Sequence, residues 1–139
     1  MSAGPRWEDV HEGEELKGFA LELTMTRMVT QVSGTQDFYP IHHDPAFARQ
    51  AGHQDIFLNT AFIRGALCRV VTDWMGAGGF LKSLGFQMRR PNFVGETIVL
   101  RGRVKKKAPG GQVDLEVWIE NRGEVTVPGT ASVILPTNP

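Results

Sequence analysis

The sequence has few of the features that would identify a function at once. It contains a single cysteine, Cys68, which excludes an intramolecular disulfide and a multi-cysteine metal site. Fifteen basic residues balance fifteen acidic residues, so no overall charge attracts nucleic acid or an anionic membrane. No apolar run reaches the roughly 18 residues that a membrane span needs. The first five residues lead into charge and not into an apolar segment, so we expect no secretory signal and a cytoplasmic protein.

Length and composition predict one globular domain. The chain has 139 residues, of which 41% are hydrophobic and 22% charged, values ordinary for a globular protein of one domain. We expect this domain to extend over residues 1–139. Residues 1–18 are polar and contain glycine, which predicts an N-terminal arm on the surface.

Two helices are predicted between residues 44 and 75. Asp44-Pro45 is typical of a helix start and predicts a short helix that ends near Ala51. Asn59 is a good N-cap for a longer helix over residues 60–75. Apolar residues cover most of that helix's circumference, which predicts that it is buried. Gly65 inside it predicts close contact with another backbone.

Strands account for most of the remaining chain. Residues 19–32 alternate in part between apolar and polar side chains, which predicts a half-buried strand, and residues 33–39 are rich in turn formers. After Gly76 the pattern is strand and turn, most clearly over residues 113–120. One buried helix followed by antiparallel strands predicts an α+β fold with a sheet wrapped around a central helix, for which a hotdog is the candidate.

The segment from Asp37 to Pro45 holds the candidate catalytic residues. The Asp37 carboxylate and the His42 imidazole, separated by a loop that contains Pro40, can address one water molecule. The alternative is a polar loop whose Asp and His satisfy only local backbone groups. The His42-His43 doublet is also typical of some metal sites. The sequence has only two further histidines, however, and we expect no metal.

This segment resembles the signature of the MaoC-like hydratases. That signature runs Ser-Gly-Asp-x-Asn-Pro-Ile-His-x-Asp-Pro-x-Phe-Ala. Here Ser33-Gly34 is followed by an apparent insertion, Thr35-Gln36, and then by Asp37-x-x-Pro40-Ile41-His42-x-Asp44-Pro45-x-Phe47-Ala48. Three further stretches resemble the family in the same order, namely Trp7–Leu16, Phe86–Thr97 and Asn121–Leu135.

The resemblance implies an enoyl-CoA hydratase with a hotdog fold. In that family an Asp and a His activate water beside the double bond of the thioester, and these roles fall here to Asp37 and His42. The backbone N–H at Thr60, next to Asn59, matches the position that stabilises the developing enolate. Coenzyme A is part of the substrate, so no separate cofactor is implied.

Two departures from the family pattern lie in the expected pocket. Tyr39 replaces the usual asparagine, and Asn59-Thr60 replaces His-Gly. A wider set of positions resembles a narrower group, the small MaoC-like subunit of actinobacterial steroid side-chain hydratases. This set is Thr35-x-Asp37-Phe38, His42-His43-Asp44, Asp55-Ile56-Phe57-x-Asn59, Val71-Thr72-Asp73-Trp74-x-Gly76 and Leu81-Lys82-Ser83-x-Gly85. That resemblance implies a bulky or steroid-derived acyl group, with Tyr39 and Phe57 in contact with it. It also implies a homodimer, or a heterodimer or heterotetramer with a second MaoC-like chain.

Basic residues offer candidates for binding the phosphates of coenzyme A. We expect Arg89 and Arg90 to do so, because arginine binds phosphate through two parallel hydrogen bonds. The alternative is a solvated strand face, which suits Arg101, Arg103 and residues 105–107.

Two other functions remain open on the sequence. A hotdog thioesterase usually has a carboxylate on or near the central helix, where this chain offers only Asp73, at the far end. The changes at Tyr39 and Asn59-Thr60 also leave open a non-catalytic acyl-CoA-binding or structural subunit. Neither nucleic acid nor a membrane is expected as a partner.

Overall fold

The computed structural model describes residues 2–139. In chain order its helices and strands are η1 (Trp7–Asp9), β1 (Glu15–Glu22), α1 (Met25–Thr35), η2 (Pro40–His42), α2 (Pro45–Gln50), α3 (Thr60–Met75), β2 (Phe80–Phe86), β3 (Thr97–Ala108), β4 (Gln112–Asn121) and β5 (Glu124–Ile134). The predicted boundaries of α3 are confirmed, and the short helix after Asp44 ends one residue earlier than predicted.

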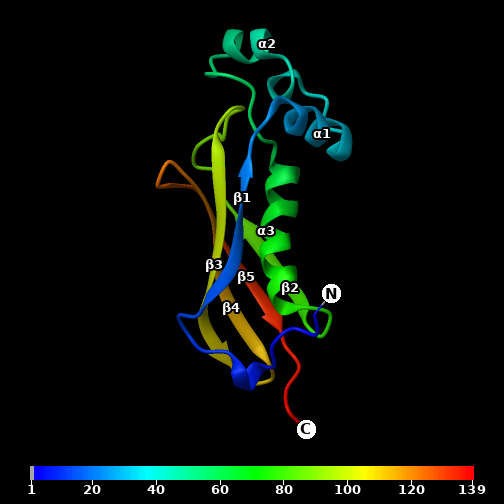
Figure 1. The fold of residues 1–139 in the computed structure, drawn as a ribbon, viewed down its shortest axis with the longest axis vertical. Helices are drawn as coiled ribbons and strands as arrows, with labels where there is room; N and C mark the ends of the chain where they lie inside the picture. The colour runs from blue at the N-terminus through cyan, green and yellow to red at the C-terminus, as the bar shows by residue number, and fades with distance from the viewer. Residues whose placement is uncertain (1) are drawn as a thin grey trace.

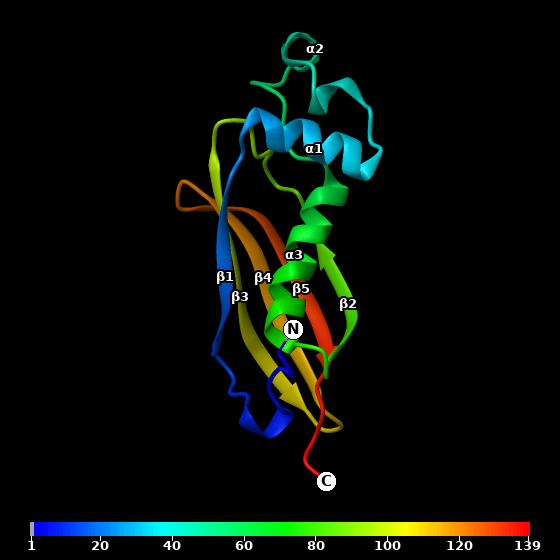
Figure 2. The ribbon, with the colours of Figure 1, turned by 45° about the vertical axis from the view of Figure 1, so that its right-hand side comes forward.

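One antiparallel sheet curves around α3. Its five strands lie in the order β1-β3-β4-β5-β2, so β1 and β2 form its two edges. Figure 1 shows α3 along one side of this sheet, with α1 and α2 beyond the N-terminal end of the helix. Figure 2, turned by 45°, shows the same arrangement and places both chain termini near the opposite end of α3. This is the predicted α+β hotdog architecture.

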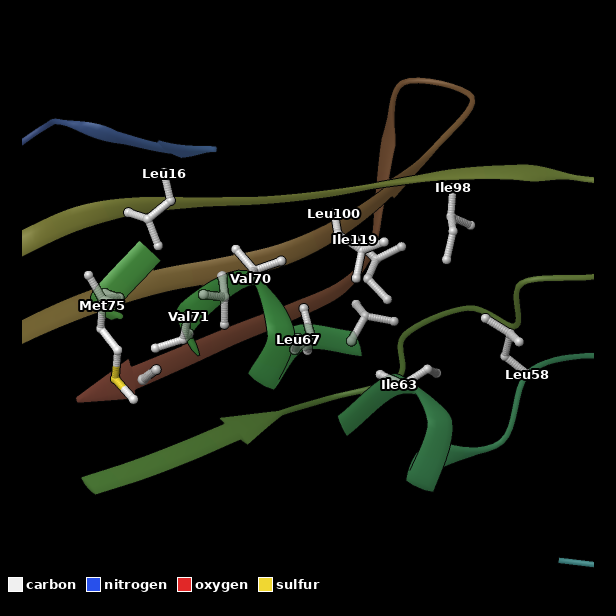
Figure 3. Close-up of a cluster of buried hydrophobic side chains, with 14 of the residues drawn as sticks. Leu16, Leu58, Ile63, Leu67, Val70, Val71, Met75, Ile98, Leu100 and Ile119 are labelled. Carbon is white, nitrogen blue, oxygen red and sulfur yellow. The ribbon is translucent and has the colours of Figure 1, made fainter. Parts of the chain in front are cut away.

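The core lies between the sheet and one face of α3. Every second residue of β4 from Val113 to Ile119 is buried, because successive side chains of a strand point to opposite faces. The helix contributes a stripe at spacings of three and four residues. Figure 3 shows this stripe against the strands, with Leu16, Leu58, Ile63, Leu67, Val70, Val71, Met75, Ile98, Leu100 and Ile119 labelled.

The other face of α3 is open, so the prediction of a helix buried nearly all round is wrong for this chain on its own. Ala61, Arg64 and Gly65 are exposed. A Cβ atom added at Gly65 would have no neighbouring heavy atom within 4 Å. The predicted close backbone contact at Gly65 is therefore absent within residues 2–139.

The segment predicted as a strand over residues 19–32 divides into a strand and a helix. β1 ends at Glu22, and the side chain of Thr24 then caps α1 by accepting a hydrogen bond from the N–H of Arg27 at 3.1 Å. Met28, Gln31 and Val32 recur at helical spacing and form the buried face of α1. This helix carries the chain from the sheet to the loop that contains Asp37.

The N-terminal segment is hydrogen-bonded to the end of the molecule that lies away from α1 and α2. The indole N–H of Trp7 donates to the carbonyl of Gln112 at 3.1 Å, and its backbone N–H donates to Pro136 at 2.9 Å. The last part of the predicted arm, from Glu15, forms the start of β1. No helix in the described part of the chain is long and apolar enough to cross a membrane.

Two substitutions on α3 test which of its faces is packed. Leu67→Ala should lower the free energy of unfolding by about 2 to 5 kcal/mol, because it leaves a cavity at a fully buried position. Gly65→Ala should raise it by about 1 kcal/mol, because alanine favours the helix and its methyl group meets open space. Urea unfolding of the monomer at low protein concentration measures both. A destabilised Gly65→Ala variant would contradict the open face.

Candidate active site

The candidate site lies where α1, the loop after it and the N-terminus of α3 meet. Figure 1 shows these segments at one end of the molecule, beyond the strands. His42 ends the turn η2, which begins at Pro40, and its side chain is buried. Proline fixes the backbone at the start of this turn, and the turn directs His42 toward the segment before α3.

His42 is oriented by a backbone carbonyl. Its Nδ1 lies 2.8 Å from the carbonyl oxygen of Phe57, and its ring meets the Phe57 ring edge-on with centroids 5.1 Å apart. Because a carbonyl oxygen only accepts hydrogen bonds, Nδ1 must carry a proton and donate it. In the neutral imidazole the lone pair is therefore on Nε2.

Asp37 faces that second nitrogen. Its Oδ2 lies 3.5 Å from Nε2 of His42, and its side chain is 39% exposed. Its Oδ1 accepts a long hydrogen bond from the N–H of Tyr39 at 3.4 Å. Two acceptors, a carboxylate oxygen and an unprotonated nitrogen, thus point toward the same place, where a water molecule can donate one hydrogen to each.

The neighbouring ionisable residues of the loop, His43 and Asp44, form hydrogen bonds with backbone groups. The ring of His43 contacts the carbonyl of Phe38 at 3.0 Å, and Asp44 caps α2 by accepting from the N–H of Phe47 at 3.1 Å. Among residues 2–139, no three His, Cys, Asp or Glu side chains form a group that could hold a metal ion. The alternative of a purely local polar loop describes His43 and Asp44, whereas Asp37 and His42 bond backbone groups and also face each other at 3.5 Å.

The N-terminus of α3 is held from two directions. The Asn59 side chain accepts from the N–H of Phe62 at 2.8 Å, which confirms it as the N-cap, and donates to Oγ1 of Thr35 at 2.8 Å. Thr60, the first residue of the helix, is exposed. Within residues 2–139, its N–H and that of Ala61 have no hydrogen-bond acceptor, as expected for the first turn of a helix.

Aromatic residues surround the Asp37–His42 pair at different depths. Phe57, predicted to contact substrate, is buried and packs between His42, His53 and Phe93. Tyr39 is 55% exposed, and its ring meets Phe47 edge-on. Tyr39 is therefore accessible beside Asp37, while the buried Phe57 packs against the ring of His42 and orients it through its carbonyl.

The contacts of the two candidate phosphate-binding arginines do not include Asp37 or His42. Arg89 lines a groove of about 710 Å³ whose lining includes neither Asp37 nor His42. Arg90 forms an ion pair with Glu124 at 2.6 Å. Their role toward coenzyme A stays a prediction.

The groove lies on the face of the sheet that points away from α3, where the arginines of β3 have carboxylate partners. Arg101 pairs with Glu120 and Arg103 with Glu116, at 3.0 and 2.6 Å. The indole N–H of Trp118 and then Arg101 lower the pKa of Glu120. Arg101 and Arg103 therefore lie on a solvated strand face, as the alternative interpretation of these basic residues predicted, and both form ion pairs there.

Sequence analysis did not identify Gln31, a buried residue of α1. It contacts both the residue that orients His42 and the residue that caps α3. Its side chain bonds the carbonyl of Phe57 at 3.1 Å and the N–H of Asn59 at 3.0 Å. The sequence carried no local signal for this role, because residues 19–32 were expected to form a strand and the partners of Gln31 lie 26 and 28 positions away along the chain.

The chain matches one protein family and several solved hotdog structures. The family model described as MaoC like domain matches residues 13–124. The 3-oxo-4,17-pregnadiene-20-carboxyl-CoA hydratase beta subunit of Mycobacterium tuberculosis is 35% identical over 79 residues, which cover 57% of this chain and 61% of that subunit. The match therefore spans less than two thirds of the relative's length.

Among solved structures, the ChsH1-ChsH2 complex from Mycobacterium tuberculosis superposes with a TM-score of 0.85 at 29% identity, over 90% of this chain and 98% of that one. The R-hydratase PhaJ1 from Pseudomonas aeruginosa superposes with a TM-score of 0.85 at 17% identity, over 96% and 86%. The second likeness, at this low identity, shows the fold alone.

Replacing Asn59 tests how firmly the start of α3 is held. Asn59→Ala should lower the free energy of unfolding by about 2 to 3 kcal/mol, because it removes a buried cap, leaves the part-buried N–H of Phe62 without an acceptor and breaks the hydrogen bond to Thr35. Asp44→Ala removes an exposed cap of similar geometry and should cost only about 1 kcal/mol. Urea unfolding compares the two, and equal small losses would contradict the buried network around Asn59.

Proposed function

Because the chain belongs to the MaoC-like domain family, we propose that it is an enoyl-CoA hydratase, which adds water across the 2,3-double bond of an acyl-CoA thioester. One observation carries the proposal. Oδ2 of Asp37 and Nε2 of His42 lie 3.5 Å apart, and the Phe57 carbonyl holds the proton of His42 on the other nitrogen.

This arrangement can activate water without a metal ligand set. A water molecule that donates to both Asp37 and His42 directs its oxygen lone pair away from them, toward the β-carbon of the substrate. As the oxygen bonds to that carbon, one proton moves from the water to the pair. The electrons of the double bond shift toward the thioester, and the pair returns the proton to the α-carbon.

The start of α3 supplies the group that stabilises the negative charge formed during this attack. Attack at the β-carbon places negative charge on the thioester oxygen, and the unpaired N–H of Thr60 at a positive helix end can stabilise that charge. The chain connects this donor to the catalytic pair over a short distance, because Phe57, which orients His42, is three residues before Thr60. The Thr60 side chain narrows the space above its N–H compared with glycine.

A bulky acyl group, steroid-derived, is the substrate class we favour. Phe38 and Tyr39, next to Asp37, are 60% and 55% exposed and offer a wide aromatic rim to an apolar ring system. The Mycobacterium tuberculosis relative is named for a pregnadiene carboxyl-CoA. Arg89 and Arg90 are our candidates for contacts with the phosphates of coenzyme A.

We propose that a second hotdog chain completes the pocket, either another copy of this chain or a MaoC-like partner. The edge strand β2 has a neighbour on one side only, and Phe80 on it is 66% exposed. The exposed residues of α3, including Gly65, lie on the face that the sheet leaves open. The ChsH1-ChsH2 structure is itself a complex.

A thioesterase has no structural support at this site. Asp73, the carboxylate on α3, is near the opposite end of the helix from Thr60 and pairs with Arg69 at 3.3 Å. It therefore lies away from the Asp37–His42 pair.

Replacement of the catalytic pair tests the proposed function. Hydration is followed as loss of the conjugated double bond, with a short-chain and a steroid enoyl-CoA in parallel, using the chain alone and then with a co-encoded MaoC-like protein. Asp37→Asn and His42→Gln should each lower kcat by at least about 100-fold, because each removes one partner of the water. Their thermal unfolding should stay close to that of the wild type.

His43→Gln is the matched control, because His43 is exposed and bonds only a backbone carbonyl. It should retain wild-type kcat. Full turnover by Asp37→Asn would contradict the proposal, and tight acyl-CoA binding without hydration, even beside a partner chain, would favour a non-catalytic subunit.

A further inference from the structure

Gln31 is a buried polar residue that the chemistry described above does not use. It lies on α1 with 2% of its surface exposed. Its Nε2 donates to the carbonyl of Phe57 at 3.1 Å and approaches Sδ of Met28 at 3.4 Å, while its Oε1 accepts from the N–H of Asn59 at 3.0 Å. Both polar atoms of the amide are therefore satisfied.

The Gln31 amide makes the two backbone hydrogen bonds that a neighbouring strand would otherwise make. Phe57 pairs with Phe93 in an antiparallel bridge, in which Ile56 and Leu58 exchange backbone hydrogen bonds with the segment around Phe93. In extended backbone, the carbonyl of one residue and the N–H two residues later point to the same side. The carbonyl of Phe57 and the N–H of Asn59 thus face away from Phe93, and Gln31 bonds both.

These two backbone groups belong to the two halves of the site. The Phe57 carbonyl also accepts from Nδ1 of His42 at 2.8 Å and so orients the imidazole. Asn59 caps α3 and precedes the N–H of Thr60. A single side-chain amide therefore fixes the acceptor that orients His42 and the residue that begins the oxyanion-binding end of α3.

We infer that Gln31 is a positioning residue, which holds His42 and the N-terminus of α3 in the relative placement that hydration needs. The catalytic part of this inference rests on the proposed function. The Gln31 side chain bonds only Met28, Phe57 and Asn59, so its loss should change the alignment of the two halves of the site without touching the residues proposed to bind coenzyme A. Small misplacements of this kind are costly in rate.

Gln31→Met tests the alignment. Methionine has a similar length and fills the buried space without bonding Phe57 or Asn59. We expect kcat to fall by about 10- to 100-fold with KM changed by no more than about twofold. Wild-type kcat in this variant would overturn the inference, as would a rise in KM with kcat unchanged.

Gln31→Glu adds a readout that a merely structural role would not give. An ionised carboxylate can accept from the N–H of Asn59 but cannot donate to Phe57, whereas a protonated carboxyl group can do both, as the amide does. The ratio of the variant's kcat to that of the wild type should therefore rise as the pH falls. A ratio independent of pH would contradict the role of donation to Phe57.

Hydrogen exchange, followed by NMR without substrate, tests the link independently of activity. Gln31→Met should speed exchange of both the Asn59 backbone proton and the His42 Nδ1 proton. Gln31→Glu should keep the Asn59 proton protected, because the carboxylate still accepts from it. Unchanged exchange of both protons in Gln31→Met would overturn the inference even if its kcat fell.

Gln50→Met and Gln50→Glu are the controls, since Gln50 is an exposed glutamine of α2. They should leave kcat, its pH dependence and both exchange rates unchanged. If the wild-type chain hydrates no enoyl-CoA, the proposed function fails. The exchange rates then still decide whether Gln31 links the two halves of the site.

Discussion

The hydrogen bond from Nδ1 of His42 to the carbonyl of Phe57, 2.8 Å long, is the interaction on which the site depends. It decides which ring nitrogen carries the proton, and so which one faces Asp37. The carbonyl cannot shift freely, because the bridge to Phe93 holds its segment on one side and Gln31 holds it on the other. The bridge to Phe93 and the hydrogen bond from α1 together therefore fix the position of His42.

The sheet-side support continues into the core through Asn92. Its side-chain oxygen accepts from Asn121 at 3.1 Å and from Thr126 at 2.9 Å, and its backbone carbonyl accepts from Leu58 at 3.0 Å. Asn92 is fully buried. The segment that carries Phe57 is therefore tied to β4 and β5 through buried hydrogen bonds.

Sequence patterns predicted the parts of the fold that depend on local signals. Asn59 at the cap and the apolar spacing after it gave the bounds of α3, and the alternation along β4 gave its buried face. The helix α1 was missed because the alternation before Glu22 was extended across Thr24, whose role as an N-cap marks the change from strand to helix. An open helix face at Gly65 was not predictable, because burial depends on which chain covers it.

The candidate site was predictable in its residue types and only partly in its geometry. The spacing of Asp37 and His42 within one loop brought the pair together, as the structure shows at 3.5 Å. The role of Gln31 could not be predicted, because its contacts join residues 26 and 28 positions apart along the chain. Arg89 lies in a groove on the outer face of the sheet, because it follows the end of β2 and its N–H donates to Thr126 of β5.

Isotope incorporation during turnover tests the central claim most directly. The chain, with any partner it requires, is incubated with a steroid enoyl-CoA in water enriched in both ¹⁸O and deuterium, and the product is analysed by mass spectrometry. The account predicts an intact thioester with one ¹⁸O on the β-carbon and one deuterium on the α-carbon. Release of free coenzyme A with ¹⁸O in a carboxylate, or no incorporation at all, would contradict it.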